Sequence, residues 1–414
     1  MSGPLLLDNP VRGYAWGSRT VIAQLQGRAA PSPAPEAELW MGAHPGSPSR
    51  VLPAGQGLDE RIAADPVGEL GPRVAGRFGP RLPFLMKVLA AAAPLSLQAH
   101  PSPAQAEEGY AREEAAGLAL DDPTRSYKDD SHKPELICAL TPFTALCGFR
   151  AINATRRLLA GLAVPRLDQL AAGLAEEDPG GGAGGGDGGE GDGEESPALR
   201  ELFAGLVTLA GDDRRVLLQQ VFAACRNDSG DPEFAAERAW VARLARDYPA
   251  DIGVVAALLL NLVELAPMEA VYLPAGNLHA YLGGVGIEIM ASSDNVLRGG
   301  LTPKHVDVAE LLKVLRFTPG PVPVLRPRRV GPEEVFDAPA KEFRLSRVII
   351  GDGSPVDLAG DGPQVLLCID GSVTVASDGV GVELVKGSSA YVPACANGTT
   401  VSGAGTVFRA TVPG

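Results

Sequence analysis

The sequence predicts a mainly β protein that carries an α-helical insertion and a second β domain at its C-terminal end. Short apolar runs divided by glycine and proline fill residues 1–150 and return after residue 317, as expected of strands joined by turns. Between residues 151 and 265 the apolar residues instead recur every three or four positions, which is typical of packed helices. A chain of 414 residues also exceeds what one core ordinarily supports. We therefore expect a first β domain from 1–150 and 266–317, a helical insertion from 151–265 and a second β domain from 318–414.

Charge and cysteine content narrow the class of protein. The net charge is −14, but residues 176–195 alone contribute eight acidic residues and no basic ones, so the remainder is only mildly acidic. An acidic chain without a basic stripe is not expected to bind nucleic acid or an anionic membrane. Any anionic substrate must then be met by a few well-placed cations. The five cysteines are odd in number and lack a CxxC pair, which predicts reduced thiols in the cytoplasm.

In the first β domain, RLPFLMKVLAAAAPLSLQAHP (residues 81–101) predicts two strands separated by Pro94. In the second of these, apolar residues alternate with Ser96, Gln98 and His100. Because strand side chains alternate between two faces, these three polar side chains should share one face. A polar face that simply meets water gives the same pattern, so the alternation alone does not identify a site.

A short helix and a loop are expected next. AEEGYAREEAAGL (residues 106–118) predicts a helix after Pro103, and DDPTRSYKDDSHKPEL predicts a loop that enters a strand. Pro134 disfavours helix for Lys133 and helps to fix the backbone there. Glu135 then begins the apolar run LICAL. A glutamate at the mouth of a buried strand is costly unless it is paired or bound to a cation.

The helical insertion is interrupted by DPGGGAGGGDGGEGDGEE (residues 178–195). This segment cannot build a core and is expected to be a disordered loop. Its glycine run is not a phosphate-cradling loop, because no Lys-Ser or Lys-Thr pair follows it. Near the end of the insertion, the longest apolar run (residues 252–263) is too short to span a bilayer, which takes ~20 residues. We expect this run to form a buried helix.

The richest set of chemically useful side chains lies within residues 268–317. His279 occupies a turn bounded by proline and glycine between two strand-like runs, and Asp294, Arg298 and Lys304 follow on loops punctuated by glycine. A histidine in such a turn suits a metal ligand, and the cations suit an anionic substrate. Taken singly, these residues could equally be solvated loop charges, so their meaning depends on the stretches around them.

The last part of the chain predicts short strands, such as FRLSRVII, QVLLCID and SVTVAS. Residues 382–401 repeat the YxPA pattern of MEAVYLPAGNLHAYL, which predicts for both segments a strand that runs into a proline-bounded turn of a double-layered β barrel. No histidine occurs after residue 305, so the C-terminal barrel is expected to be structural and metal-free.

Three stretches carry a family resemblance: LSLQAHP (95–101), SHKPEL (131–136) and PAGNLHAYL followed by SDNVLRGGLTPK (293–304). Together they resemble the type I phosphomannose isomerases, which are zinc enzymes of the cupin superfamily. YAWGS (14–18) and ELWMGAHPGSPS (38–49) resemble the N-terminal region of the same family.

The resemblance implies a fold and an activity. The fold is a cupin-type double-stranded β-barrel catalytic domain, a helical subdomain and a second, cupin-like barrel. The activity is the interconversion of mannose 6-phosphate and fructose 6-phosphate through an enediol-type intermediate. Such an enzyme supplies mannose for GDP-mannose and glycan synthesis or uses mannose as a carbon source. A monomer is expected.

Carried over residue by residue, the resemblance assigns the site. One Zn²⁺ ion per chain falls on Gln98, His100, Glu135 and His279. This set leaves coordination positions for water or sugar, which distinguishes a catalytic site from a closed structural one. Arg298 takes the position of the active-site arginine. The implied substrate-binding residues are Ser96, Lys133, Asp294 and Lys304, with Ser96 and Lys304 at the phosphate-binding positions.

Some assignments stay open. The C2 proton could be moved by Lys133, Asp294 or a metal-bound water. His44 could be a ligand by residue type, but it is not in the family's metal set and is expected to be structural. The sequence departs from the family at Asn277–Leu278, where many relatives carry glutamate and then proline or threonine, and at Ser131, where asparagine is common. None of these is an assigned ligand, so the departures concern fine specificity.

Two other functions share these features. Two histidines and one carboxylate also form the facial triad of Fe(II) oxygenases. The additional ligand Gln98 and the cations Arg298 and Lys304 argue against that class. A non-catalytic sensor of sugar phosphates would keep the metal and Lys304 but would bind its ligand without turnover. Metal analysis, oxygen uptake and an assay for fructose 6-phosphate separate the three.

Overall fold

The computed structural model describes residues 3–177, 193–227, 232–351, 355–358, 360 and 362–414. It shows a mixture of antiparallel sheets and helices, as predicted. The glycine-rich stretch that is expected to be disordered, 178–195, lies outside the described residues except for its last three. Within the described ranges no helix has both the length and the apolar character that crossing a membrane requires.

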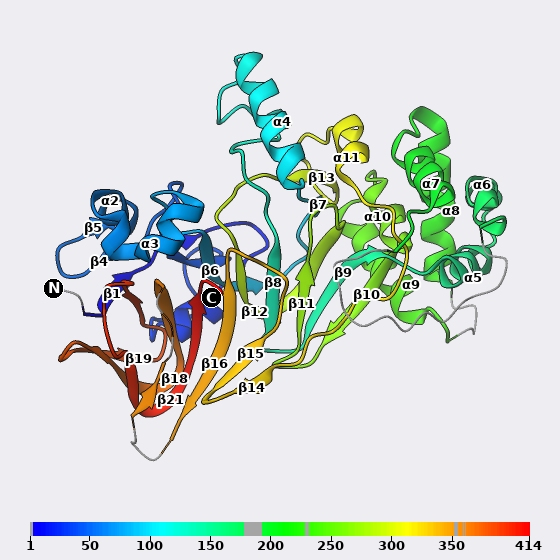
Figure 1. Cartoon of the computed structure of the whole chain (residues 1–414). Coiled ribbons are helices and arrows are strands. Elements are labelled where there is room, and N and C mark those ends of the chain that lie inside the picture. The colour runs from blue at the N-terminus through cyan, green and yellow to red at the C-terminus, as the bar shows by residue number, and fades with distance from the viewer. Residues whose placement is uncertain (1–2, 178–192, 228–231, 352–354, 359, 361) are drawn as a thin grey trace.

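Two sheets form the body of the protein (Figure 1). The ten-stranded sheet contains β2 (Val11–Arg12), β3 (Glu38–Gly42), β6 (Phe84–Ala91), β7 (Leu97–Ala99), β8 (Glu135–Ala139), β9 (Phe143–Phe149), β10 (Leu260–Leu265), β11 (Ala270–Leu273), β12 (His279–Ala291) and β13 (Leu297–Gly300). The eleven-stranded sheet contains β1 (Leu5–Asp8), β4 (Arg50–Val51), β5 (Gln56–Gly57), β14 (Arg328–Val330), β15 (Glu333–Phe336), β16 (Arg344–Ile350), β17 (Val356–Asp357), β18 (Gln364–Ser377), β19 (Val380–Val385), β20 (Ser389–Val392) and β21 (Thr400–Thr411).

The two ends of the chain meet in one sheet. β1 pairs with β20 and with β4, so the first strands of the chain join those of the C-terminal segment. The two sheets also share a core, in which Leu39 and Met86 are buried in one cluster with Phe343 and Phe408. Because each buried side chain of this kind contributes ~1.5–3 kcal/mol, the sheets stabilise each other.

Strand β12 is the central strand of the ten-stranded sheet and pairs with four other strands. Its first half pairs with β9 and, at His279, with β7, whereas its second half pairs with β6 and β8. The partners change near Gly284, whose φ of +121° is accessible mainly to glycine. A Cβ atom there would also lie 2.7 Å from Pro142 O. This glycine lets one long strand serve both parts of the sheet while its first residue, His279, lies beside β7.

The helices are α1 (Val21–Leu25), α2 (Leu58–Ala64), α3 (Pro66–Phe78), α4 (Pro103–Ala115), α5 (Ile152–Leu162), α6 (Pro165–Leu170), α7 (Pro197–Val207), α8 (Gly211–Arg226), α9 (Ala235–Asp247), α10 (Gly253–Ala256) and α11 (Val308–Val314), with 3₁₀ turns η1 (Ala172–Ala175) and η2 (Ala257–Leu259). Helices α5 to α10 gather at one end of the molecule, on the right of Figure 1. In α7, Leu199, Leu202, Phe203 and Leu206 follow the three-and-four spacing, and all four are fully buried.

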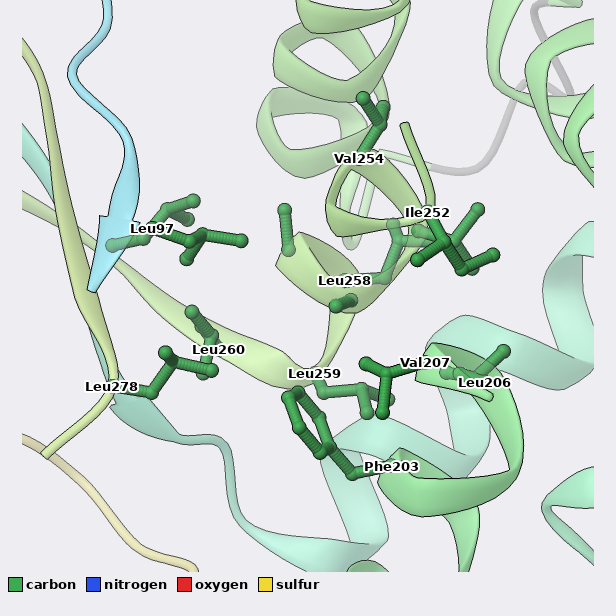
Figure 2. Packing of buried hydrophobic residues seen from close by; sticks show 14 of the residues in the cluster. Leu97, Phe203, Leu206, Val207, Ile252, Val254, Leu258, Leu259, Leu260 and Leu278 are labelled. Atoms are coloured by element: carbon green, nitrogen blue, oxygen red, sulfur yellow. The ribbon is translucent and has the colours of Figure 1, made fainter. Parts of the chain in front are cut away.

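The helix expected for residues 252–263 is only partly present. The helical segment ends at Leu259, and β10 begins at Leu260 and pairs with β9. The prediction of one helix is therefore wrong. A fully apolar run fits a helix and a buried strand equally well. Residues 260–265 form a strand because they pair with the edge of β9. Figure 2 shows the resulting core, where side chains of β7 and β10 meet those of α7 and α10.

Candidate active site

Strand β7 sets the orientation of the site. Leu97 and Ala99 are fully buried in the core against the helices, so Gln98 projects from the opposite face, as the alternation predicts. Gln98 pairs with His279 of β12 on one edge and with Arg298 of β13 on the other. Directly paired residues point to the same side of a sheet. Gln98, His279 and Arg298 therefore form a row across three neighbouring strands.

Three possible ligands meet beside this row. The ligand atoms of His100, Glu135 and His279 all lie within 4.8 Å of one another, and all three residues are about 1% exposed. His100 Nε2 is 3.1 Å from Glu135 Oε1, and His279 Nε2 is 3.4 Å from Glu135 Oε2. The amide Nε2 of Gln98 lies 3.4 Å from His279 Nε2. Rotating this amide by half a turn presents its oxygen to the same point.

The hydrogen bonds of the two histidines fit a metal ion. His100 Nδ1 donates to Asn295 O at 2.7 Å, and His279 Nδ1 donates to Asn277 O at 3.0 Å. In the neutral ring this leaves a lone pair on each Nε2 atom. Burial lowers the pKa of His100 to about 4, so that ring is neutral at physiological pH. Buried lone pairs then face a carboxylate, and His100 Nε2 and Glu135 Oε2 lack hydrogen-bond partners in the described structure. A cation between them satisfies these atoms.

Lys133 lies at the edge of this group. Its Nζ atom is 2.9 Å from Glu135 Oε1, and the residue is buried. Burial alone would raise the pKa of Glu135, but the ammonium of Lys133 and the neighbouring His100 hold it well below its usual value. The carboxylate is therefore charged, as a metal ligand must be.

The other predicted residues lie around this group. Arg298 is half-buried, and burial lowers the pKa of its guanidinium, which still remains charged. Lys304 is exposed on the loop after β13. Asp294 lies beside His44, with 3.6 Å between Oδ1 and Nε2, and its backbone N–H donates to a carboxylate oxygen of another aspartate. Ser96 directly precedes β7 and is half-buried.

Asn295 joins the loops of the site and was not singled out from the sequence. Its backbone oxygen receives the hydrogen bond of His100, and its side chain is fully buried. Nδ2 donates to Asp129 O at 2.7 Å and to Ser131 O at 2.9 Å. Oδ1 accepts from the backbone N–H of Lys128 at 2.6 Å and of Asp129 at 3.2 Å. One side chain thus fixes the loop before Glu135 against the loop before Arg298.

Comparison with known proteins identifies the family. Residues 5–152 match the model of the phosphomannose isomerase type I catalytic domain. The chain is 38% identical to the mannose-6-phosphate isomerase of Escherichia coli strain K12 over 410 residues, which covers 97% of this chain and 98% of that protein. The chain belongs to the type I phosphomannose isomerase family. It is also 33% identical to the enzyme of Rattus norvegicus over 395 residues, with 88% of this chain and 86% of that protein covered.

Solved structures of the family have the same fold. The crystal structure of a zinc-bound mannose 6-phosphate isomerase is similar over 100% of both chains, with a TM-score of 0.86 at 37% identity. The apo form from Salmonella typhimurium also gives 0.86, at 36% identity. The resemblance read from three short stretches therefore extends over the whole chain.

This member of the phosphomannose isomerase family also has a buried ion-pair group that sequence reasoning missed. Lys87 of β6 is 3.0 Å from Glu288 of β12 and 3.7 Å from Glu38 of β3, and all three residues are buried. Burial alone would lower the pKa of Lys87, but the charges of Glu288 and Glu38 raise it above its usual value. A signal was present, because a lysine within the apolar run FLMKVLA needs a partner.

A second missed contact links the site to the C-terminal part of the chain. His132, next to Lys133, lies 3.0 Å from Glu342 Oε1 on the segment between β15 and β16. Burial alone would raise the pKa of Glu342, but the hydrogen bond and charge of His132 lower it. No local pattern in the sequence reveals this pair, because its members are 210 residues apart.

Proposed function

We propose that this phosphomannose isomerase family member interconverts mannose 6-phosphate and fructose 6-phosphate. The observation that carries the proposal is the buried group of His100, Glu135 and His279, whose ligand atoms all lie within 4.8 Å of one another, with His100 Nε2 and Glu135 Oε2 lacking hydrogen-bond partners in the described structure. Relatives across its full length are named for this reaction. The product would supply mannose for GDP-mannose and glycan synthesis, or mannose would serve as a carbon source.

We assign one Zn²⁺ ion per chain to Gln98, His100, Glu135 and His279. Two imidazole nitrogens, a carboxylate and an amide oxygen are ligands that zinc accepts, and four protein ligands leave room for expansion by a sugar oxygen. The crystal structure of the zinc-bound relative contains the same metal. When bound, the ion acts as a Lewis acid that stabilises negative charge on an oxygen of the sugar.

The side chains of the protein have three tasks in this reaction. A proton must leave the carbon beside the carbonyl and return to the neighbouring carbon, and negative charge develops on oxygen in between. Arg298, half-buried on the same face as Gln98, can stabilise that charge in a region of low dielectric. Lys133, whose Nζ atom is 2.9 Å from Glu135 Oε1, can orient or protonate a sugar oxygen. Asp294, beside His44, is an exposed carboxylate that can accept a proton.

Binding of the phosphate falls to Lys304, with Ser96, and this separates two kinds of kinetic defect. The phosphate does not change during the reaction, so Lys304→Ala should raise KM much more than it lowers kcat. Arg298→Ala should instead lower kcat by ~10²-fold or more, because the negative charge on oxygen that Arg298 stabilises develops only in the transition state. Metal content should stay the same in both variants. If Arg298→Ala keeps the wild-type kcat and only raises KM, the arginine binds the phosphate and does not stabilise the transition state.

The proposal is tested by a coupled assay for fructose 6-phosphate with metal analysis and oxygen uptake on the same sample. We expect isomer formation with one zinc per chain. Oxygen uptake with iron in the site would indicate an oxygenase. Binding of sugar phosphate without turnover would indicate a sensor.

The remaining features of the proposal concern the whole chain. We propose that the catalytic domain, residues 1–150 and 266–317, is a cupin-type barrel, that residues 151–265 are its helical insertion and that 318–414 form a metal-free cupin-like barrel. The antiparallel pairing of both sheets supports two barrels. The strands at residues 5–8 and 50–57 are the exception to these boundaries, because they pair within the sheet of the C-terminal segment. We also propose a cytoplasmic monomer, which is consistent with five free cysteines.

A further inference from the structure

Cations without partners gather next to the site. Arg112, close by on α4, is paired with Glu310 at 2.9 Å. In contrast, Arg298, Lys304 and Lys128 form no ion pair within the ranges that the structure describes. In a protein with a net charge of −14, leaving three neighbouring cations uncompensated indicates a site for an anion.

The backbone of Lys128 is fixed on both sides. Tyr127, just before it, is buried, and its hydroxyl donates to Glu310 of α11 at 2.9 Å. The backbone N–H groups of Lys128 and Asp129 donate to the side chain of Asn295, at 2.6 and 3.2 Å. Helix α11 follows the loop of Lys304, and Asn295 precedes Arg298. Lys128 is therefore held between the two segments that carry the other cations.

The side chain of Lys128 is available to a ligand. The carboxylate of the next residue, Asp129, is occupied by Ser293 Oγ and by the backbone N–H of Asp294. Lys128 itself is exposed, which leaves its ammonium free to meet an incoming group. Lys128 is close enough to Lys304 to affect its titration. Burial is the main cause of the lowered pKa of Lys304, and the positive charges of Arg298 and Lys128 lower it further.

We propose that Lys128 is a second phosphate-binding lysine, which holds the phosphate of the sugar together with Lys304. The inference rests on the proposed function, because it takes a sugar phosphate as the ligand. A phosphate dianion has several acceptor oxygens and can be met by more than one point charge. Since the phosphate is unchanged by the reaction, Lys128 contributes to binding of substrate and transition state alike.

The test compares Lys128→Gln with Lys128→Arg and with Lys386→Gln, a matched change at an exposed lysine on the turn after β19. We expect Lys128→Gln to raise KM for mannose 6-phosphate about tenfold, with a smaller effect on kcat, as for loss of one charge-assisted hydrogen bond. The inhibition constant of inorganic phosphate should rise by a similar factor. Lys128→Arg should recover most of both, and Lys386→Gln should behave as wild type.

Inorganic phosphate allows the role of Lys128 in phosphate binding to be tested separately from the isomerase activity. A wild-type chain that forms no fructose 6-phosphate refutes the proposed function. Lys128 is then tested by the rise in unfolding temperature that inorganic phosphate produces in wild type, which should be smaller in Lys128→Gln. The role of Lys128 is overturned if Lys304→Ala raises both KM and the inhibition constant while Lys128→Gln changes neither. It is also overturned if Lys128→Arg fails to restore binding in a folded protein.

Discussion

Asn295 offers the sharpest test of how the site is held together. Asn295→Asp keeps the shape of the side chain but replaces its NH₂ group with an oxygen. That oxygen would face the carbonyl oxygens of Asp129 and Ser131, which accept hydrogen bonds at 2.7 and 2.9 Å in the native protein. The side chain is fully buried, so water cannot take the place of the lost donors.

The size of the effect follows from these contacts. Two lost hydrogen bonds cost ~1 kcal/mol each, and leaving their part-buried acceptors opposite a further oxygen adds ~1–3 kcal/mol. Asn295→Asp should therefore lower the free energy of unfolding by ~3–5 kcal/mol. Because the backbone oxygen of Asn295 receives the hydrogen bond of His100, zinc should also bind about 10–100-fold more weakly.

Urea unfolding of the metal-free protein and zinc competition with a chelating indicator measure the two effects separately. Asn153→Asp, on the exposed first turn of α5, introduces the same charge and should change the unfolding free energy by no more than ~0.5 kcal/mol. If Asn295→Asp unfolds at the same urea concentration as wild type and binds zinc equally well, the reasoning about this side chain is wrong.

Three further outcomes are expected. Lys87→Met should lower the free energy of unfolding by ~3–5 kcal/mol, because it leaves buried carboxylates unpaired, and adding Glu288→Gln should restore part of the loss in the same urea assay. The lowered pKa of Glu342 contributes stability that is present above its unfolded pKa of 4.5 and is lost as pH falls through the lower folded value. Glu342→Gln should therefore flatten the fall in unfolding temperature below pH 4.5, and an unchanged slope would exclude the contribution. Deleting residues 180–193 should keep at least half of kcat/KM, because a shorter loop changes closure entropy only slightly; a larger loss in a folded variant would mean that the segment takes part in function.

Local sequence patterns predicted individual helices and strands better than they predicted which segments pack or pair with one another. The alternation around Gln98 predicts its orientation, and the three-and-four spacing predicts the helices of the insertion, because each follows from the geometry of one element. The run from 252 to 263 failed because a fully apolar segment fits helix and strand equally well. The partner that decides it, β9, lies more than a hundred residues earlier in the chain.

The site could be assembled from the sequence only through the family resemblance. Gln98 and His279 are 181 residues apart, and no spacing rule brings them together. The supporting residues were missed for a different reason. Lys87, Glu288 and Asn295 were not singled out, because their roles depend on contacts between segments that are distant in sequence.

The central claim, a zinc-dependent isomerase with one metal site per chain, is tested most directly by titrating activity with metal. Protein stripped with a chelator should form no fructose 6-phosphate, and activity should rise linearly with added Zn²⁺ and level off at one ion per chain. The variant His100→Ala with His279→Ala, which removes two of the four assigned ligands, should not recover at that ratio. Full turnover in the metal-free protein, or a plateau only at two ions per chain, would contradict the account.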